Sequence, residues 1–463
     1  MRNTDLTQGN TWKLLVMFAI PLFFSNLLQQ LYNAMDAMVV GRFVGDTALA
    51  AVGSVGPLIN TIIAFFMGMS TGASVLISRY YGARDPKGLH DTLHTAMLLA
   101  AIIGVVLGTI GVVLTPALLG LMKTPLEVAP EATIYLRIFF IGMPTLTIYN
   151  MGAAALTAVG DAKRPLFFLA IATVINIIGN LLLVLVIPLG VAGVSISTVA
   201  SQLITAVLVV IVLSRSNAEY RLIFRNLGLR ANILKQVASI GLPSGLQLAI
   251  VGLSNIIVQS YVNGLGKTAM AGAGASGRVE AFVLLPVQAM ALALATFVGQ
   301  NLGAGQVRRA RNGVRSAMII TMAITAVISL LAVTFGKSLL RIFTASPEVV
   351  ELGYQFMRVY VPAYVVLAFT SVLPGALRGA GDVRVATVAS VFCFVVVRQI
   401  YLFFITKAHY TITAVALGFP STWVLAGGII FIHYLRTNWS AFEKKPDGEQ
   451  PLPVLEDVSQ ELL

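Results

Sequence analysis

The amino-acid sequence predicts an all-α polytopic membrane protein, with about twelve transmembrane helices in two pseudo-symmetric six-helix bundles. Three observations support this fold class. Of the 463 residues, 57% are apolar and 11% are charged, whereas about 25% of residues are charged in soluble proteins. The apolar residues form continuous runs, such as 96–121 and 317–335, which are long enough to cross a hydrocarbon layer of ~30 Å. Finally, the second half of the chain repeats the first.

Apolar runs separated by charged or turn-forming residues predict twelve membrane segments. They are expected near residues 12–40, 47–77, 92–118, 131–157, 166–188, 192–214, 236–265, 268–299, 313–336, 349–377, 386–408 and 411–435. Several exceed the ~20 residues that a span requires, so we expect them to be tilted or kinked. Bends are expected at the prolines inside them, because each proline removes one backbone hydrogen bond: Pro21, Pro243, Pro286, Pro362 and Pro374.

The repeat is visible as a constant shift between the two halves. Residues 45–83 align without a gap with residues 266–304, and the same shift pairs Gly160-Asp161 with Gly381-Asp382. Six segments in each half is an even number, so both halves should cross the membrane in the same orientation. We therefore expect four parts: an N-terminal lobe (1–214), a basic cytoplasmic linker (215–235), a C-terminal lobe (236–435) and a disordered cytosolic tail (436–463).

The distribution of Lys and Arg predicts the orientation. With both termini in the cytoplasm, the inner connections hold 16 basic residues, and the outer ones hold six: Arg42, Lys123, Lys267, Lys337, Arg341 and Lys407. Cytoplasmic loops carry the excess of positive charge in membrane proteins. Both termini are therefore predicted to be cytoplasmic, in a multi-pass protein of a plasma membrane.

Composition and motifs exclude several classes of function. The net charge of +12 lies in the short connections, which is typical of membrane topology and not of a nucleic-acid-binding face. No phosphate-binding loop of the Walker type is present, so the sequence does not support ATP-driven export. Cys393 is the single cysteine and lies in an apolar run. We expect no enzyme, no cofactor and no structural metal site.

Asp36 is the most informative residue, because a charge inside a membrane span costs ~2.5–3.5 kcal/mol or more. Gln29 and Asn33 lie on the same helical face as Asp36. Such a polar stripe is expected to face the protein interior or a cavity. Asp36 would then exchange a proton or bind Na⁺; the alternative is a structural hydrogen bond or an ion pair with an arginine.

Further polar residues occur inside the later segments. Asn176 and Asn180 are four residues apart on one helical face, and Thr198 follows in the next segment. These side chains either join helices or complete a cation site beside Asp36. Glu280 either faces a cavity and attracts cationic substrates or pairs with Arg398. Among the many Met and Phe residues, Met290 is a candidate for a soft, adaptable substrate cavity.

In combination, several motifs resemble the MATE multidrug and toxin extrusion transporters, most closely the bacterial DinF-like and MepA-like members. The resemblance rests on Ile20-Pro21, on Asp36 followed by Val40-Gly41-Arg42, on residues 297–304 and on the turns at 160–161 and 378–382. It implies a secondary exporter of the MATE/MOP fold. The resemblance also implies that Asp36 couples transport to H⁺ or Na⁺, that Pro21 is a hinge, and that Tyr135, Asn176, Asn180 and Thr198 assist Asp36.

Two departures from the family pattern affect the predicted site. Some relatives carry a second aspartate at the place of Asn180, so Asp36 is left as the sole acid in the first half and the coupling ion is not determined. The acidic pair of NorM-like members is also missing, since Gln247 and Arg358 are the polar residues of those segments. Gln247 is a candidate for the substrate cavity.

The resulting hypothesis is a monomeric exporter that exchanges H⁺ or Na⁺ for lipophilic organic cations by alternating access. An alternative is a flippase for lipid-linked saccharides or a peptidoglycan precursor, which would use Arg278, Arg358 and Arg398 to hold a pyrophosphate. A receptor or channel without coupled transport is the third possibility, and it fits two matched bundles less well.

Overall fold

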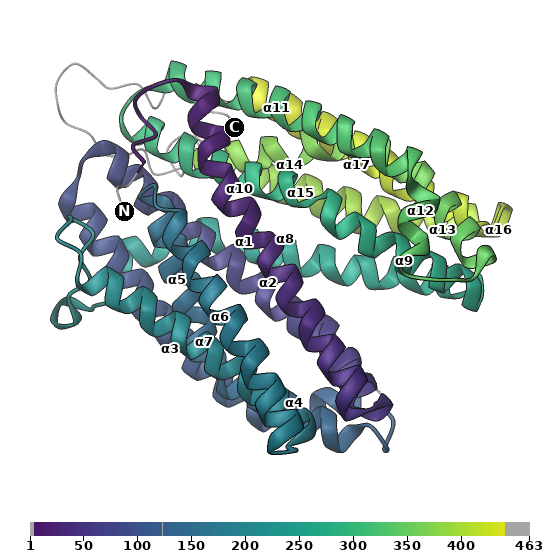
Figure 1. Cartoon of the computed structure of the whole chain (residues 1–463). Helices are drawn as coiled ribbons and strands as arrows, with labels where there is room; N and C mark the ends of the chain where they lie inside the picture. Colours follow the sequence, from purple (N-terminus) through teal and green to yellow (C-terminus); the bar gives the residue numbers. More distant parts are fainter. Residues whose placement is uncertain (1–3, 123, 440–463) are drawn as a thin grey trace. The chain divides into compact units, whose positions relative to one another are not determined.

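The computed structural model describes residues 4–122 and 124–439, and the described residues form helices and connections without a β-strand (Figure 1). The first half contains α1 (Thr11–Val39), η1 (Val40–Val44), α2 (Asp46–Ala83), α3 (Pro86–Leu121), α4 (Ala129–Ile141), α5 (Met143–Ala158), α6 (Lys163–Leu181), η2 (Leu182–Val186) and α7 (Gly190–Ser214). The second half contains η3 (Phe224–Asn226), α8 (Ala231–Asn263), α9 (Lys267–Val283), α10 (Leu285–Gly303), α11 (Val307–Thr334), α12 (Gly336–Arg341), α13 (Pro347–Tyr360), α14 (Tyr364–Gly379), α15 (Arg384–Val391), η4 (Phe392–Val397), α16 (Arg398–Ala408) and α17 (Ile412–Arg436).

The predicted all-α membrane fold is confirmed. Ten helical segments of the described chain are long and apolar enough to cross a membrane, and two bent helix pairs raise that number to twelve. The pairs are α4 with α5, bent by 48°, and α13 with α14, bent by 53°. Pro144 lies in the first turn of α5, and Pro362 lies between α13 and α14, so both bends occur where proline interrupts the backbone hydrogen bonds.

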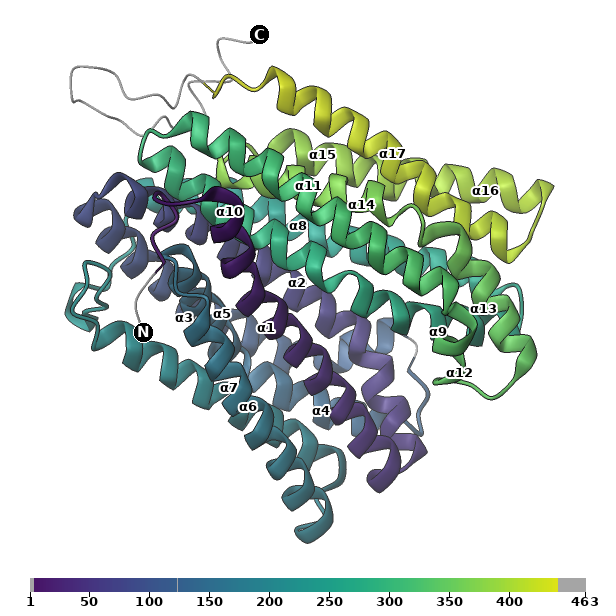
Figure 2. The ribbon, with the colours of Figure 1, turned by 45° about the horizontal axis from the view of Figure 1, so that its top comes forward.

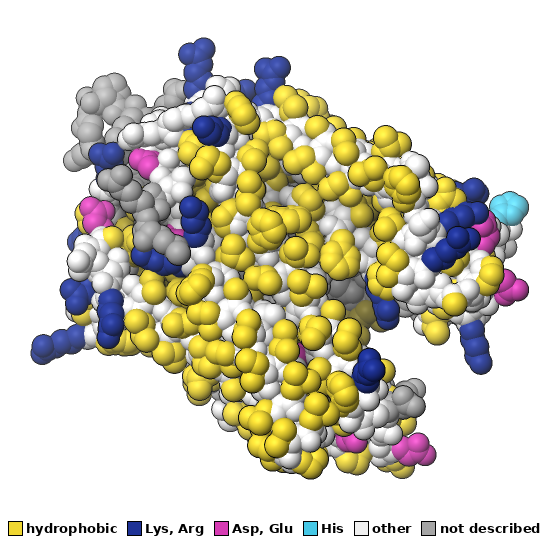
Figure 3. Space-filling model, viewed as in Figure 1, with side chains coloured by type: hydrophobic (Ala, Val, Ile, Leu, Met, Phe, Trp, Pro, Cys, Tyr) yellow, Lys and Arg dark blue, Asp and Glu magenta, His cyan; other side chains and the backbone are white. Residues whose placement is uncertain are grey.

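The surface of the helices is suited to lipid. Large apolar side chains are exposed in both halves, including Val113 at 70% and Leu330 at 68% of their full area. Figure 3 shows hydrophobic side chains over the middle of the helices and Lys and Arg side chains near the helix ends. Patches of this extent would be unstable in water, whereas a bilayer solvates them.

The first compact unit comprises residues up to Asp5 and Phe24–Leu242. Within it α3 packs against α5 and α4, α6 packs against α7, and α2 packs against α5, an arrangement that can be followed in Figure 2. One buried cluster joins α2, α3, α5 and α7 with Tyr220 and Leu222, which follow α7, and with Ile233 and Val237 at the start of α8.

The second compact unit comprises Leu6–Phe23 and the chain from Pro243 onwards. Its helix α14 packs against α10, α11 and α17, while α13 packs against α9 and α17. An aromatic cluster that includes Tyr360, Tyr364 and Trp423 fills the space between α13, α14 and α17.

The structural division of the chain differs from the predicted one at two places. Leu6–Phe23 belong to the second unit, because Gln300 and Asn301 of α10 hydrogen-bond to the backbone of Leu6. The linker and residues 236–242, which were predicted to start the C-terminal lobe, belong to the first unit, where the linker packs on α3. The boundary inside α1 follows Phe23, two residues after Pro21. Most of the predicted tail (440–463) and Lys123 lie outside the described residues.

Candidate functional site: a buried aspartate in the first lobe

Asp36 lies in the last turn of α1 and is buried, with 8% of its area exposed. The helix does not end there but continues as the π-helical turn η1. A second π-helical turn, η2, starts two residues after Asn180 on α6. Wide turns of this kind are rare in proteins overall. Those that do occur are often found at functional sites. The helices that carry Asp36 and Asn180 therefore both change their winding directly beyond these residues.

Two side chains from neighbouring helices hold the Asp36 carboxylate. Asn180 of α6 donates a hydrogen bond of 2.6 Å from Nδ2 to Oδ1 of Asp36. Thr198 of α7 donates one of 3.2 Å from Oγ1 to Oδ2. Asn176 lies behind them: its Oδ1 accepts a 3.2 Å bond from Asn180, and its Nδ2 donates a 3.4 Å bond to Thr198. Asn176, Asn180 and Thr198, which were predicted from the sequence, thus surround Asp36 in one network.

The network extends to residues that the sequence analysis did not single out. Tyr32 is buried one helical turn before Asp36, and its hydroxyl lies 3.1 Å from Oγ of Ser201. Ser197 donates a 2.9 Å bond to the backbone carbonyl of Asn176. The four-residue spacing of Tyr32 and Asp36 is a signal that could have identified this tyrosine. Tyr135 of α4, which was predicted, packs on the valine cluster that surrounds the same end of α1.

The oxygen atoms of the site suit a small hard cation or a proton. Oδ1 of Asn180 is buried and accepts no hydrogen bond from any described residue. Together with the Asp36 carboxylate and the Thr198 hydroxyl, it supplies oxygen donors of the type that hard cations prefer. No arginine or lysine contributes to the hydrogen bonds of Asp36 within the described chain, so the predicted alternative of an arginine ion pair is not formed.

The residues predicted to line a substrate cavity differ in how deeply they are buried. Gln29 and Asn33 of α1 are exposed, whereas Asp36 is buried. Gln247 of α8 is half-buried and accepts a 3.4 Å bond from Thr387. Met290 is 4% exposed and belongs to the packed interior of α10.

Arg398 is buried in the second lobe and does not form the direct ion pair with Glu280 that one prediction required. Its guanidinium donates two hydrogen bonds to Oγ1 of Thr422, at 3.2 and 2.9 Å, and one of 3.3 Å to Asn255. It also lies over the rings of Phe394 and Phe419, at 5.1 and 4.7 Å from their centroids. Glu280 is close enough to attract it electrostatically.

The three arginines of the flippase alternative do not share one environment. Arg398 is buried, whereas Arg278 and Arg358 are exposed, and Arg278 lies over the ring of Phe343. A site for a pyrophosphate requires several cationic groups directed at one point. This arrangement does not favour the flippase alternative.

These features define the class of the protein as a polytopic membrane transporter. It has two related helical lobes, helix surfaces suited to lipid, and a buried acid held by hydrogen bonds from neighbouring helices. A family model described as MatE matches residues 21–182 and again residues 243–404. The chain belongs to this family, and the two matches of equal length confirm the internal repeat. By the shift that relates residues 45–83 to 266–304, the apolar Ile257 stands at the place of Asp36 and Val397 at the place of Asn176. The buried acid is therefore a feature of the first lobe.

Known relatives and solved structures agree with this assignment. The chain is 29% identical over 440 residues to the probable multidrug resistance protein YoeA of Bacillus subtilis, covering 92% of this chain and 94% of that protein. It is 26% identical over 352 residues to a protein of Shewanella oneidensis described as an FAD transporter, covering 74% and 77%. A solved MOP superfamily transporter from Pyrococcus furiosus, 23% identical, has the same fold with a TM-score of 0.88 over 96% of this chain and all of that one.

Proposed function

We propose that this protein is a secondary active multidrug exporter that exchanges H⁺ or Na⁺ for lipophilic organic cations. The observation that carries the proposal is the buried Asp36 carboxylate, held by Asn180 and Thr198 without a basic partner among the described residues. Keeping an uncompensated charge in an apolar span is costly, so binding of a cation or a proton there is favourable. Similarity to relatives such as YoeA, a probable multidrug resistance protein, supports drug export.

In the proposed cycle, the ion binds Asp36 when the site is open to the outside, and α1 rearranges near Pro21. The drug then leaves, the ion is released inward, and a new drug molecule binds from the cytoplasm. The proposed orientation has both termini in the cytoplasm of a bacterial cell, and the proposed unit of transport is a monomer. A ligand shifts the equilibrium between two conformations of a transporter only when it binds one of them more tightly than the other.

Transport by reconstituted protein tests the proposal. Ethidium efflux from vesicles is measured with a pH gradient and a sodium gradient imposed separately. Efflux driven by one of the two gradients is expected, and efflux that neither gradient accelerates contradicts ion exchange. Lipid-headgroup-dependent binding of an undecaprenyl pyrophosphate, without ethidium transport, would instead favour the flippase.

Asn180→Ala should reveal which ion is coupled. The substitution removes a hydrogen bond to a carboxylate, worth ~1.5–3 kcal/mol, which corresponds to about a tenfold shift or more in the half-saturating ion concentration. For H⁺ this concentration should fall, because the charged carboxylate loses a donor. For Na⁺ it should rise, because an amide oxygen is lost as a ligand.

Asn150→Ala is the matched control for this measurement. Asn150 is in α5 of the same lobe and donates to the backbone carbonyl of Leu146, one turn earlier in its own helix. Its replacement should leave the half-saturating ion concentration unchanged. A shift of the same size in both variants would show that the Asn180 effect does not come from Asp36.

A further inference from the structure

The linker between α7 and α8 lies on the first lobe as a docked segment. Tyr220 and Leu222 are 5% and 3% exposed and belong to the same buried cluster as Leu89 and Leu93 of α3. The backbone N–H of Leu222 also donates to the carbonyl of Leu213 at the end of α7. The linker is thus packed against α3 by buried apolar side chains.

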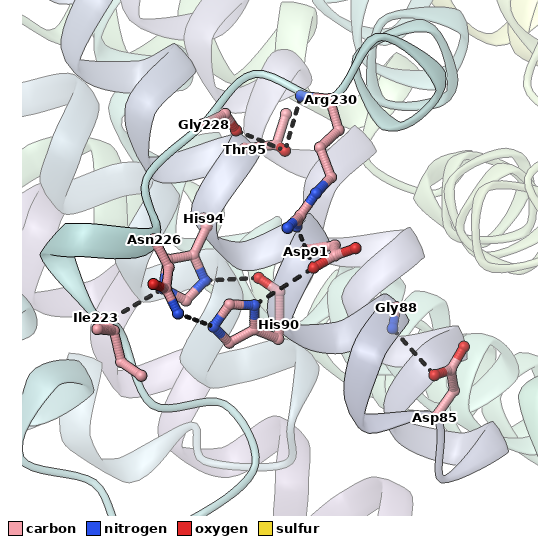
Figure 4. Close-up of polar contacts among 10 residues, drawn as sticks. All are labelled: Asp85, Gly88, His90, Asp91, His94, Thr95, Ile223, Asn226, Gly228 and Arg230. Carbon is pink, nitrogen blue, oxygen red and sulfur yellow. Dashed lines mark hydrogen bonds and ion pairs between the residues drawn. The ribbon is translucent and has the colours of Figure 1, made fainter.

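Polar contacts between α3 and the linker flank this packing (Figure 4). Thr95 of α3 donates a 3.1 Å hydrogen bond to the carbonyl of Gly228. Asp91, one turn earlier, forms an ion pair with Arg230. Nε2 of His90 lies 3.3 Å from the side-chain amide of Asn226. The second and third turns of α3 therefore contact the linker at three points: Asn226, Gly228 and Arg230.

The hydrogen bonds of His94 define its protonation state. Nδ1 of His94 lies 2.6 Å from the backbone carbonyl of His90, which can only accept, so Nδ1 carries the proton. Nε2 lies 2.9 Å from the backbone nitrogen of Ile223, which can only donate, so Nε2 carries none. The side chain is fully buried, at 0% exposure. The docked linker therefore requires the neutral ring with its hydrogen on Nδ1.

We propose that the linker (215–230) is a pH-sensitive latch: it docks on α3 while His94 is neutral and is released when His94 binds a second proton. A proton on Nε2 would face the N–H of Ile223, so an acceptor would become a second donor and the bond would be lost. Histidine is the side chain whose charge ordinarily changes between pH 5 and 8. In the proposed orientation, the latch would respond to the pH of the cytoplasm.

The groups around His94 strengthen the dependence of linker release on pH. His90 stacks on it, with ring centroids 3.8 Å apart, and is itself titratable. Arg230 of the linker carries a positive charge that opposes a positive charge on His94. Among the helices packed on α3, α2 contributes Tyr80 near Asp91, and α5 contributes Tyr149, which faces the carbonyl of Pro165. A second positive charge in this cluster therefore favours release.

Hydrogen–deuterium exchange of the purified full-length chain tests the latch. Protection of peptides covering 219–228, corrected for intrinsic exchange, is compared at pH 7.5 and pH 5.5. If one proton is linked to release and the free ring behaves as an ordinary histidine, protection should fall about tenfold over this interval. Peptides from α14 are expected to show no such change.

Two glutamine variants distinguish the two histidines. In His94→Gln the amide oxygen can still accept from Ile223 but does not titrate, so protection should persist at pH 5.5. His90→Gln should retain the tenfold fall, and Asp91→Asn should weaken protection equally at both pH values. Constant protection in the wild type, a persisting fall in His94→Gln or a lost fall in His90→Gln would each overturn the latch. If His94→Gln does not fold, the wild type and His90→Gln still decide the question.

This result is independent of the exporter assignment. All the contacts that carry the latch lie within the first compact unit, and the exchange measurement needs neither a drug nor an ion gradient. A failure of ethidium transport would leave the exchange result intact, and the reverse also holds.

Discussion

Asp36→Asn is expected to reduce gradient-driven ethidium efflux to the level of protein-free vesicles while leaving the lobe folded. Asparagine has the shape of aspartate, and its Oδ1 can still accept a hydrogen bond from Asn180, so the contacts of α1 with α6 should survive. What is lost is the charge, because an amide neither releases a proton nor attracts Na⁺. The loss should occur with either gradient, and ethidium binding should persist.

Glu351→Gln is the matched control for the loss of one carboxylate. Glu351 is exposed and pairs with Lys337 at 2.8 Å on the surface of the second lobe, where an ion pair contributes little. Efflux by this variant should equal that of the wild type. Undiminished, gradient-dependent efflux by Asp36→Asn would remove the basis of the proposed exchange mechanism, since no other described acid is held in this way in the first lobe.

Gly379→Ala is expected to be the most destabilising small substitution in the second lobe. A Cβ atom at Gly379 would lie 2.4 Å from the backbone carbonyl oxygen of Ala295, and one at Gly375 would lie 2.6 Å from that of Ala291. The two glycines let α14 approach the backbone of α10 directly, which is a common way of packing membrane helices. A backbone atom cannot move aside as a side chain does, so the helices must separate.

Overpacking of this kind costs ~1–3 kcal/mol or more. Thermal unfolding in detergent should therefore begin roughly 5 °C lower than in the wild type. Gly428→Ala is the control, because a Cβ atom at this position in α17 has no neighbour within 4 Å. Its unfolding temperature should be unchanged or slightly raised, since alanine favours a helix over glycine. Equal unfolding temperatures for both variants would show that the α10–α14 contact tolerates separation.

The residues of the Asp36 site could be selected from the sequence, but their arrangement could not. An acid or an amide inside an apolar span is conspicuous because it is expensive there, so Asp36, Asn176 and Asn180 stand out. Which partner each one meets depends on how α1, α6 and α7 pack. Helical spacing places Tyr32 near the face of Asp36, as it does Gln29 and Asn33, but it does not show that Tyr32 is the one that is buried.

Helix number, the internal repeat and family membership were determined by the sequence, because hydrophobicity over ~20 residues and a constant shift are properties of the chain itself. The tertiary structure decided three things: Arg398 bonds to Thr422 and Asn255, α1 is divided between two units, and the linker docks on His94. Each of these depends on contacts between residues that are distant in sequence. These residues are brought together by the packing of the helices, and local sequence patterns do not predict that packing.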